Sequence, residues 1–386
     1  MKKIFFLADS LVDLKFLYTL LRKKYEISWV YYHKNLKSDL LKLDCDNNKL
    51  FFLHTNTFIL ILKKILSKFG LLKINYEREA LKKINIIDKK YKPDLWITDT
   101  GNLLSQIDLN APKATFKHSV PYKKFFLSEN TYKYDYVFVP GFYHYKRILS
   151  YYPNKFAQFK KKLKISFSPK IFPYINIKNK KKIFFQKTHL NKKKKTVLLA
   201  TTHDAFFAKR FLPKNFKDES LALSKICDII TKELNYNFII KLHHYHFEKL
   251  NDPKFDYLKK LKNVFIFKSN KYFDSVESDL IFINSDIIIT DTSGVGPIGC
   301  FLDKQMVYLN PDKPFSWKDS DIEKKMRPGF VLHNIAELKR ILQAYERQPL
   351  VFKKQRNNFS KKIFKYQKLS DIGIILEQIK EILSKD

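Results

Sequence analysis

Short apolar runs alternate with helical patterns along the first half of the chain. The runs span residues 2–10, 26–33, 92–101 and 135–141, and most end at a Thr, Asp or Pro-Gly turn. Such runs, without polar alternation, are typical of strands buried on both faces of a parallel sheet. Residues 11–24 and 77–90 have the spacing of amphipathic helices. This order predicts one doubly wound α/β domain over about residues 1–169.

The alternation starts again after a lysine-rich segment over residues 178–195, where we place the domain junction. Strands are predicted within 196–204, 237–246, 263–267 and 286–290, and helices over 219–234 and 369–386. No sequence repeat relates the two halves. We therefore expect two Rossmann-like domains that face each other across a cleft. The predicted divisions are an N-terminal Rossmann-like domain over 1–177, a second Rossmann-like domain over 178–370 and a C-terminal helix over 371–386.

One turn in the second half carries the clearest chemical signal. The stretch SDIIITDTSGVGPIGC passes from an isoleucine-rich strand into small and hydroxyl-bearing residues, namely Asp291, Thr292, Ser293, Gly294, Gly296 and Pro297. Backbone N–H groups converge where a strand ends and a helix begins, and phosphates bind there. The turn is thus a candidate phosphate site. An ordinary capped turn is the alternative.

The chain carries a large positive charge. It has 74 Lys+Arg against 38 Asp+Glu, which gives a formal net charge of +36. Such a charge favours anionic partners: nucleic acid, an acidic membrane surface or a phosphorylated substrate. The lysines are spread along the chain and no RRM, KH, helix-turn-helix or zinc-finger signature accompanies them, so we expect no nucleic-acid partner.

The cysteines and the apolar runs indicate the compartment. Cys45, Cys227 and Cys300 are widely spaced without a CxxC pair, which favours neither disulfides nor zinc and fits a reducing cytoplasm. Asp9 interrupts the first apolar run too early for a signal peptide, and no run has the length of a membrane span. The amphipathic stretch Thr57–Ile74 either rests on an anionic membrane or packs on its own sheet.

Two DxD stretches resemble metal-binding motifs that occur in some transferases. They lie at Asp44–Asp46 and Asp319–Asp321, in polar loops away from the predicted cleft. We therefore expect no metal and no cofactor.

Histidines follow several predicted strands. His118, His144, His203 and His243 lie beyond strand ends, where an imidazole can deprotonate a hydroxyl or contact a phosphate. A solvated or structural role is the alternative for each of them.

Four segments together resemble a known family: FKHSVPYKK, YVFVPGFYHYKRI, IIKLHHYHF and SDIIITDTSGVGPIGCFLDKQMVYL. They resemble the CDP-glycerol glycerophosphotransferases, the teichoic-acid primases and polymerases with a GT-B fold. The resemblance spans roughly residues 90–310. The chain departs from the family pattern at Lys117, Ser119, His244, Thr292 and Gly294.

The resemblance implies roles for particular residues. It makes His118 the catalytic base and gives Lys241 and His243 the task of offsetting charge on the transferred phosphoryl group. The residues that it implies for donor binding are Lys241, Asp291, Thr292, Ser293, Gly294 and Gly296. His144 and His203 are further candidates.

The implied reaction moves glycerol phosphate from CDP-glycerol to a hydroxyl of a lipid-linked or polymeric glycan acceptor. This reaction serves cell-envelope synthesis, for a teichoic-acid-like polymer or a capsule polysaccharide. The implied location is the cytoplasm, peripherally on the inner face of an anionic membrane. The alternative is a GT-B glycosyltransferase that uses a UDP-, GDP- or CMP-sugar, or a sugar-nucleotide epimerase.

Overall fold

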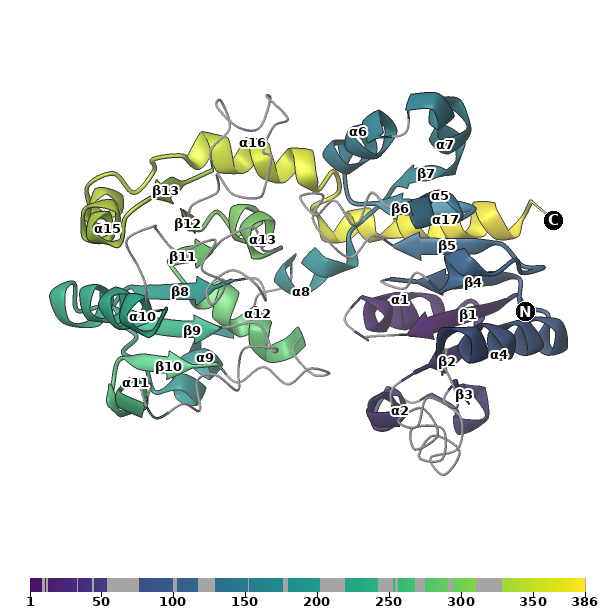
Figure 1. Cartoon of the computed structure of the whole chain (residues 1–386), viewed down its shortest axis with the longest axis horizontal. Helices are drawn as coiled ribbons and strands as arrows, with labels where there is room; N and C mark the ends of the chain where they lie inside the picture. The colour runs from purple at the N-terminus through teal and green to yellow at the C-terminus, as the bar shows by residue number, and fades with distance from the viewer. Residues whose placement is uncertain are drawn as a thin grey trace, which may run out of the picture. The chain divides into compact units, whose positions relative to one another are not determined.

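The structure, a computed structural model, forms two compact units (Figure 1). The first unit comprises residues 1–170 and 370–386, and the second comprises residues 171–369. The described residues are 1–8, 11, 13–32, 34–43, 45–53, 76–99, 103–116, 129–151, 153–175, 180–201, 219–241, 253, 256–267, 275–290, 294–309 and 328–385.

The first unit is built on a parallel sheet. Within the described residues it has seven strands in the order β3-β2-β1-β4-β5-β6-β7. The strands are β1 (Lys3–Ala8), β2 (Glu26–Tyr31), β3 (Leu50–Phe52), β4 (Leu95–Thr98), β5 (Lys113–Phe116), β6 (Tyr136–Val139) and β7 (Leu163–Ile165). All neighbouring pairs are parallel. The predicted doubly wound pattern is therefore confirmed for this unit.

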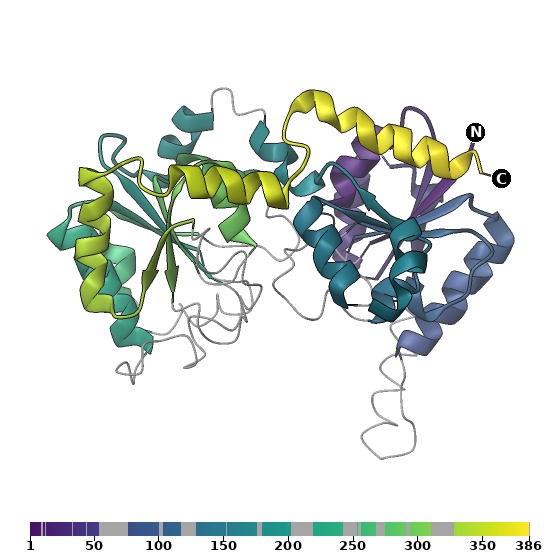
Figure 2. The same ribbon diagram turned by 90° about the horizontal axis from the view of Figure 1, so that it is seen from above.

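Helices cover both faces of this sheet (Figure 2). They are α1 (Leu14–Leu21), α2 (Lys34–Leu41), α4 (Tyr76–Tyr91), α5 (Glu129–Tyr132), α6 (Phe142–Tyr151), α7 (Phe156–Lys162) and α17 (Gly373–Leu383). Consecutive β1 residues point to opposite faces. Phe5 joins a cluster with Ile84 of α4, whereas the Phe6 ring meets Trp29, which Tyr18 of α1 also contacts. This arrangement explains why β1 is apolar without alternation.

The C-terminal helix α17 packs on the first unit. Its buried residues Ile375, Ile379 and Ile382 follow the helical period. Gln378 Nε2 donates to the carbonyl oxygen of Ile165 at 2.9 Å, and the Lys164 Nζ to Glu381 Oε1 distance is 3.0 Å. The sequence pattern predicted this helix, over 371–386, as a separate element that follows a domain over 178–370. In the structure it belongs to the same compact unit as the N-terminal residues.

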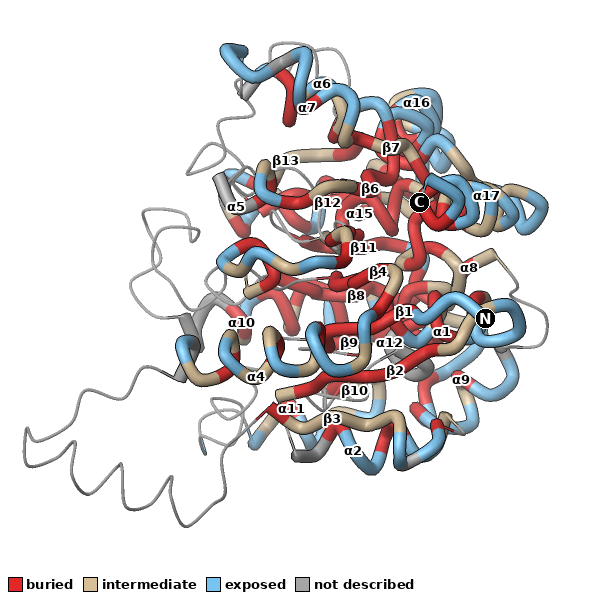
Figure 3. Tube along the Cα trace, turned by 90° about the vertical axis from the view of Figure 1, so that its right-hand side faces the viewer, coloured by how far each residue is buried: buried red, intermediate tan, exposed pale blue. Residues whose placement is uncertain are grey.

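The second unit is also built on a parallel sheet. Its described residues form six strands in the order β10-β9-β8-β11-β12-β13. The strands are β8 (Thr196–Ala200), β9 (Asn237–Lys241), β10 (Val264–Ile266), β11 (Ile287–Thr290), β12 (Gln305–Leu309) and β13 (Phe330–Leu332). The central strands β8 and β11 are buried along their whole length and are drawn in red in Figure 3.

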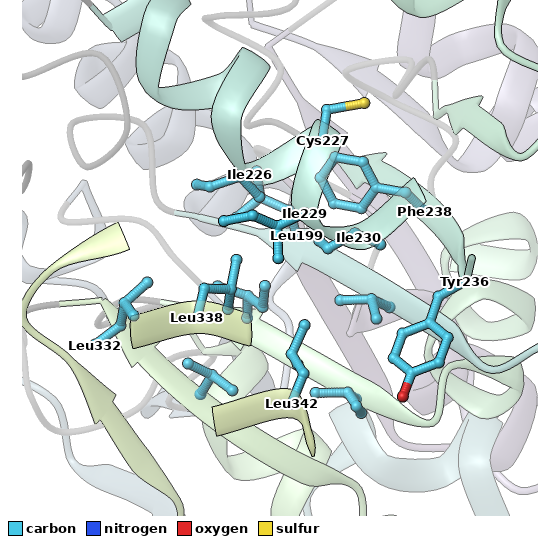
Figure 4. Packing of buried hydrophobic residues seen from close by; sticks show 14 of the residues in the cluster. Leu199, Ile226, Cys227, Ile229, Ile230, Tyr236, Phe238, Leu332, Leu338 and Leu342 are labelled. Atoms are coloured by element: carbon cyan, nitrogen blue, oxygen red, sulfur yellow. The ribbon is translucent and has the colours of Figure 1, made fainter. Parts of the chain in front are cut away.

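The helices of the second unit surround this sheet. They are α8 (Phe172–Ile175), α9 (Lys180–Thr188), α10 (Glu219–Asp228), α11 (Asp256–Lys260), α12 (Ser275–Asn284), α13 (Val295–Phe301), α15 (Leu338–Arg347) and α16 (Lys353–Ile363). Ile226 of α10 and Leu338 and Leu342 of α15 join Leu199 and Phe238 of the strands in one core cluster (Figure 4).

Two predicted elements differ in detail. The helix predicted over 219–234 ends at Asp228 and continues as a π-helical turn over Ile229–Glu233. Within the lysine-rich segment, α9 forms although its sequence has little helical periodicity, and Phe184 of this helix is buried. Packing against α12 thus stabilises a helix whose own apolar spacing is not that of an amphipathic helix.

No helix in the described part of the chain is long and apolar enough to cross a membrane. The amphipathic stretch Thr57–Ile74 lies outside the described residues.

Candidate functional site

Four strand ends of the second sheet lie in one row. Lys241 of β9 pairs with Ala200 of β8, Ala200 with Thr290 of β11, and Thr290 with Tyr308 of β12. Thr290 Oγ1 donates to the carbonyl oxygen of Ala200 at 2.6 Å, which ties β11 to β8 at this edge. In open α/β sheets this carboxyl edge is where ligands bind.

Three segments with predicted site residues begin at this row. His203 follows β8, His243 follows β9, and Asp291, Thr292 and Ser293 follow β11. The strand register therefore brings together the points from which these segments leave the sheet. The five residues themselves lie outside the described part of the chain.

Lys241 is the positively charged residue in this row. It is the last residue of β9 and its side chain is half-buried. Its Nζ lies 5.5 Å from the centroid of the Phe267 ring, a cation–π contact, and Phe267 itself is buried. An ammonium group held over an aromatic ring beside a strand end is well placed to attract an anion.

The glycines after β11 bring α13 close to the sheet. Gly294 is the N-cap of α13 with φ −58° and ψ −7°, which any residue adopts. A Cβ at Gly296 would meet the Tyr308 ring at 3.5 Å and Thr290 Cγ2 at 4.0 Å. A Cβ at Gly299, which sequence reasoning did not single out, would lie 2.5 Å from Met306 Sδ. Close packing, rather than backbone freedom, accounts for Gly299.

The corresponding edge of the first sheet carries the other candidates. His118 follows β5 and lies outside the described residues. His144 lies in the first turn of α6 with only 3% of its surface exposed. Asp99 directly follows β4 and is 2% exposed. Burial, together with the Asp99 carboxylate, raises the pKa of Tyr134. The two units thus carry separate sets of candidates, each beyond strand ends.

Two of the three cysteines are unsuited to act as nucleophiles. All three are buried, and burial raises the pKa of the Cys227 thiol to about 11 and that of Cys300 to about 12. Thiols with such pKa values are almost entirely protonated at neutral pH and are poor nucleophiles.

The two DxD stretches are only partly described. Asp46 Oδ1 accepts from the backbone N–H of Asn48 at 2.9 Å, a local turn contact. Asp44 and residues 319–321 lie outside the described residues. The residues that the structure describes contain no group of three or more His, Cys, Asp or Glu side chains that could hold a metal ion.

Comparison with solved structures shows the fold. The wall teichoic acid polymerase TagF, in a variant structure with CDPG, matches with a TM-score of 0.61 at 14% identity, covering 100% of this chain and 88% of that chain. The UDP-GlcNAc 2-epimerase from Methanocaldococcus jannaschii matches with a TM-score of 0.63 at 16% identity, covering 99% and 100%. The enzyme from Neisseria meningitidis bound to UDP-GlcNAc also has a TM-score of 0.63, at 14% identity, covering 100% of both chains. The predicted α/β class with two Rossmann-like domains is confirmed.

Comparison of the sequence with family profiles is more specific. The profile described as CDP-glycerol:poly(glycerophosphate) glycerophosphotransferase matches residues 100–373. No curated protein sequence matches the chain. The matched range includes His118, His243 and the turn after β11. It also includes the row of strand ends formed by Ala200, Lys241, Thr290 and Tyr308.

Proposed function

Because the chain belongs to the CDP-glycerol:poly(glycerophosphate) glycerophosphotransferase family, we propose that its acceptor is a hydroxyl of a lipid-linked or polymeric glycan. Family membership makes it an enzyme of the CDP-glycerol glycerophosphotransferase type, and the resemblance found in the sequence is confirmed. The proposed product is a polymer of the teichoic-acid type or a glycerophosphate substituent of a capsule polysaccharide. The observation that carries the proposal is the family match over 100–373, which includes the candidate histidines of both units and the turn after β11.

The proposed reaction is a displacement at phosphorus. The acceptor oxygen attacks the β-phosphorus of CDP-glycerol, the bond from that phosphorus to the bridging oxygen breaks, and CMP leaves. His118 takes the proton of the attacking hydroxyl. Lys241 and His243 offset the charge that develops on the phosphoryl oxygens, and positioning supplies much of the acceleration.

The donor diphosphate is proposed to bind at the carboxyl edge of the second sheet. Three observations support this: the row of four strand ends, the Lys241 ammonium group at that row and the turn that leads into α13. The first N–H groups of a helix have no acceptor within it and can donate to a phosphate. The proposed donor contacts come from Lys241, Asp291, Thr292, Ser293, Gly294 and Gly296.

A nucleotide-sugar donor is the second candidate, because the UDP-GlcNAc 2-epimerases have the same fold. Incubation with CDP-glycerol and with UDP-, GDP- and CMP-sugars separates the two. Release of CMP from CDP-glycerol alone supports the proposal. Selective turnover of a nucleotide sugar contradicts it.

The role of His118 is tested by a matched pair of variants. His118→Asn is expected to lower turnover at least about a hundredfold while the affinity for CDP-glycerol stays nearly unchanged, because a general base acts in the transition state. Wild-type activity is expected to fall below about pH 6.5, as protonation of a histidine base removes its acceptor, and this fall is absent from the residual activity of the variant. The control His189→Asn replaces an exposed histidine between α9 and β8, where φ is 57° and asparagine is tolerated.

Full activity of His118→Asn would remove this residue from the mechanism. Asp99 would then be the next base to test.

We further propose peripheral binding to an anionic membrane surface, where a lipid-linked acceptor would lie. The net charge of +36 supports this.

A further inference from the structure

A small hollow lies at the carboxyl edge of the first sheet. It is lined by Asp13, Phe116, Phe138, Val139, Pro140, Ser166, Phe167, Ser168 and Pro169. These residues come from the start of α1, from the ends of β5 and β6, and from the segment after β7. Phe116 is also the last described residue before the segment that carries His118. The hollow thus adjoins the chain segment of the proposed base.

Asp13 faces this hollow from the beginning of α1. It is the N-cap residue of that helix, but its carboxylate makes no capping hydrogen bond to the helix. Its side chain is only 2% exposed. The lining of the hollow therefore includes a buried carboxylate, whose two oxygens can accept several hydrogen bonds.

Ser166 provides the second polar group. Its backbone N–H donates to the carbonyl oxygen of Val139 at 2.9 Å, so Ser166 is held against the end of β6. The residue is 1% exposed, and its Oγ has no hydrogen-bond partner within the described part of the chain. Buried hydroxyls are normally paired, so an unpaired one that lines a hollow indicates an absent partner. Ser168 adds a further buried hydroxyl.

The polar groups that line the hollow favour an uncharged hydroxyl group as the occupant. A carboxylate repels phosphate, whereas it accepts a hydrogen bond from an alcohol. The serine hydroxyls donate to the alcohol oxygen or accept from its proton. Phe116 and Phe138, stacked with 4.2 Å between ring centroids, offer an apolar wall to the carbon atoms beside such a hydroxyl.

The size of the hollow shows which hydroxyl this is. It offers about 10 Å³ to the centre of a water-sized group, which is about the space of one water molecule. The space suits one hydroxyl group, and a hydroxyl that fills it leaves no room beside it in the hollow for a phosphoryl group. The occupant is therefore a hydroxyl next to the reacting one.

We infer that the hollow formed by Asp13, Ser166 and Ser168 binds a non-reacting hydroxyl of the acceptor's terminal polyol and so selects acceptors that end in a diol. This inference rests on the proposed function. The hollow positions the neighbouring hydroxyl for attack and disfavours acceptors with a single terminal alcohol by the strength of one hydrogen bond.

The test compares two soluble acceptors, octyl glycerol phosphate and octyl 3-hydroxypropyl phosphate, which differ only in the second hydroxyl. With the wild-type protein, the diol acceptor is expected to have the lower KM, by about three- to tenfold, the usual effect of one hydrogen bond. Ser166→Ala is expected to raise the KM for the diol about as much and to leave the KM for the single alcohol unchanged. Asp13→Asn is also expected to raise the KM for the diol acceptor.

Controls separate binding from folding. Ser28→Ala removes a buried hydroxyl of β2 that does not line the hollow, and both KM values should stay unchanged. Ser166→Ala should not lower the melting temperature, because the hydroxyl that it removes has no partner among the described residues. The affinity for CDP-glycerol, measured by calorimetry, should be the same in all variants.

Equal KM values of the wild type for the two acceptors, or an equal loss for both in Ser166→Ala, would mean that the hollow holds only water, and would overturn the inference. Binding of CDP-glycerol without any transfer to the diol acceptor would also overturn it, with the donor assignment intact. Failure to bind CDP-glycerol would instead overturn the proposed function and, with it, the inference.

Discussion

At the scale of single residues, two glycines show where close approach leaves no room for a side chain. Gly299 brings α13 against Met306 and Ile288, and Gly329 brings the start of β13 against the backbone of β12. A Cβ at Gly329 would lie 2.1 Å from the carbonyl oxygen of Met306. A backbone atom cannot move aside as a flexible side chain does. The requirement for glycine is therefore stricter at position 329 than at position 299.

Gly329→Ala is expected to destabilise the second unit by about 2 kcal/mol or more, because the strand pair must separate to admit the methyl group. Gly373→Ala is the matched control, since a Cβ there meets no described atom within 4 Å. Alanine at the first residue of α17 should stabilise that helix by up to about 1 kcal/mol. Urea unfolding followed by circular dichroism measures both changes, and a comparable loss in the two variants would contradict the packing argument.

At the scale of elements, helix α16 packs with the buried residues Phe359 and Ile363 and makes a directed contact through one buried arginine. Arg356 is 1% exposed, and its Nε lies 2.9 Å from Asp303 Oδ1. One of its terminal nitrogens donates to the carbonyl oxygen of Val351 at 2.8 Å. Asp303 follows α13, so the guanidinium group joins α16 to the end of the helix that bears the candidate donor turn. The bond to Asp303 ties α16 to the end of α13, and the bond to Val351 fixes the chain at the start of α16.

Arg356→Lys is therefore expected to destabilise the second unit by about 2–4 kcal/mol, because an ammonium group cannot reproduce both contacts and would be buried. Lys354→Ala on the exposed side of the same helix should change stability by no more than about 0.5 kcal/mol. Guanidinium titration of both variants checks this. A lysine variant as stable as the wild type would show that charge alone, without the fork geometry, suffices.

The elements that sequence patterns predicted best are the central strands. β1, β8 and β11 are apolar on both faces, and their patterns remain visible without any knowledge of neighbours. β3 and β10 have only part-buried residues, and each is three residues long. β3 was not predicted, whereas the apolar run over 263–267 did predict β10, so a place at the sheet edge weakens the pattern without always removing it.

At the scale of the whole molecule, the positive charge is the dominant surface property. Lys182 on α9 and Lys192 and Lys193 just after it are exposed, and they lie in the lysine-rich segment over 178–195. Lys63, Lys64 and Lys68 of the amphipathic stretch lie outside the described residues. Clustered lysines attract anionic lipids within about one Debye length.

Binding to anionic vesicles is expected to weaken strongly by about 1 M salt and to be absent with neutral vesicles. The triple variant Lys182→Glu, Lys192→Glu and Lys193→Glu should lose most of this binding. The same charge change at Lys259, Lys260 and Lys262, which are exposed in another part of the second unit, is the control. Equal loss in the two triple variants, in vesicle sedimentation, would point to net charge rather than to this segment.

The sequence by itself determined the class of fold and the segments that carry the chemistry. Buried parallel strands and amphipathic helices are local patterns, because each residue's environment repeats with the period of its own element. The turn after β11 and the histidine segments were recognisable for the same reason, since each lies within a few residues of a strand end.

Only the tertiary structure decided which of these segments lie side by side. The row of Lys241, Ala200, Thr290 and Tyr308 depends on strand order and register, which arise from contacts between residues distant in the chain. The return of α17 to the first unit and the hollow between Asp13 and Ser166 have the same origin. No local pattern records such contacts, because their free energy comes from burying surfaces that meet only when the chain folds.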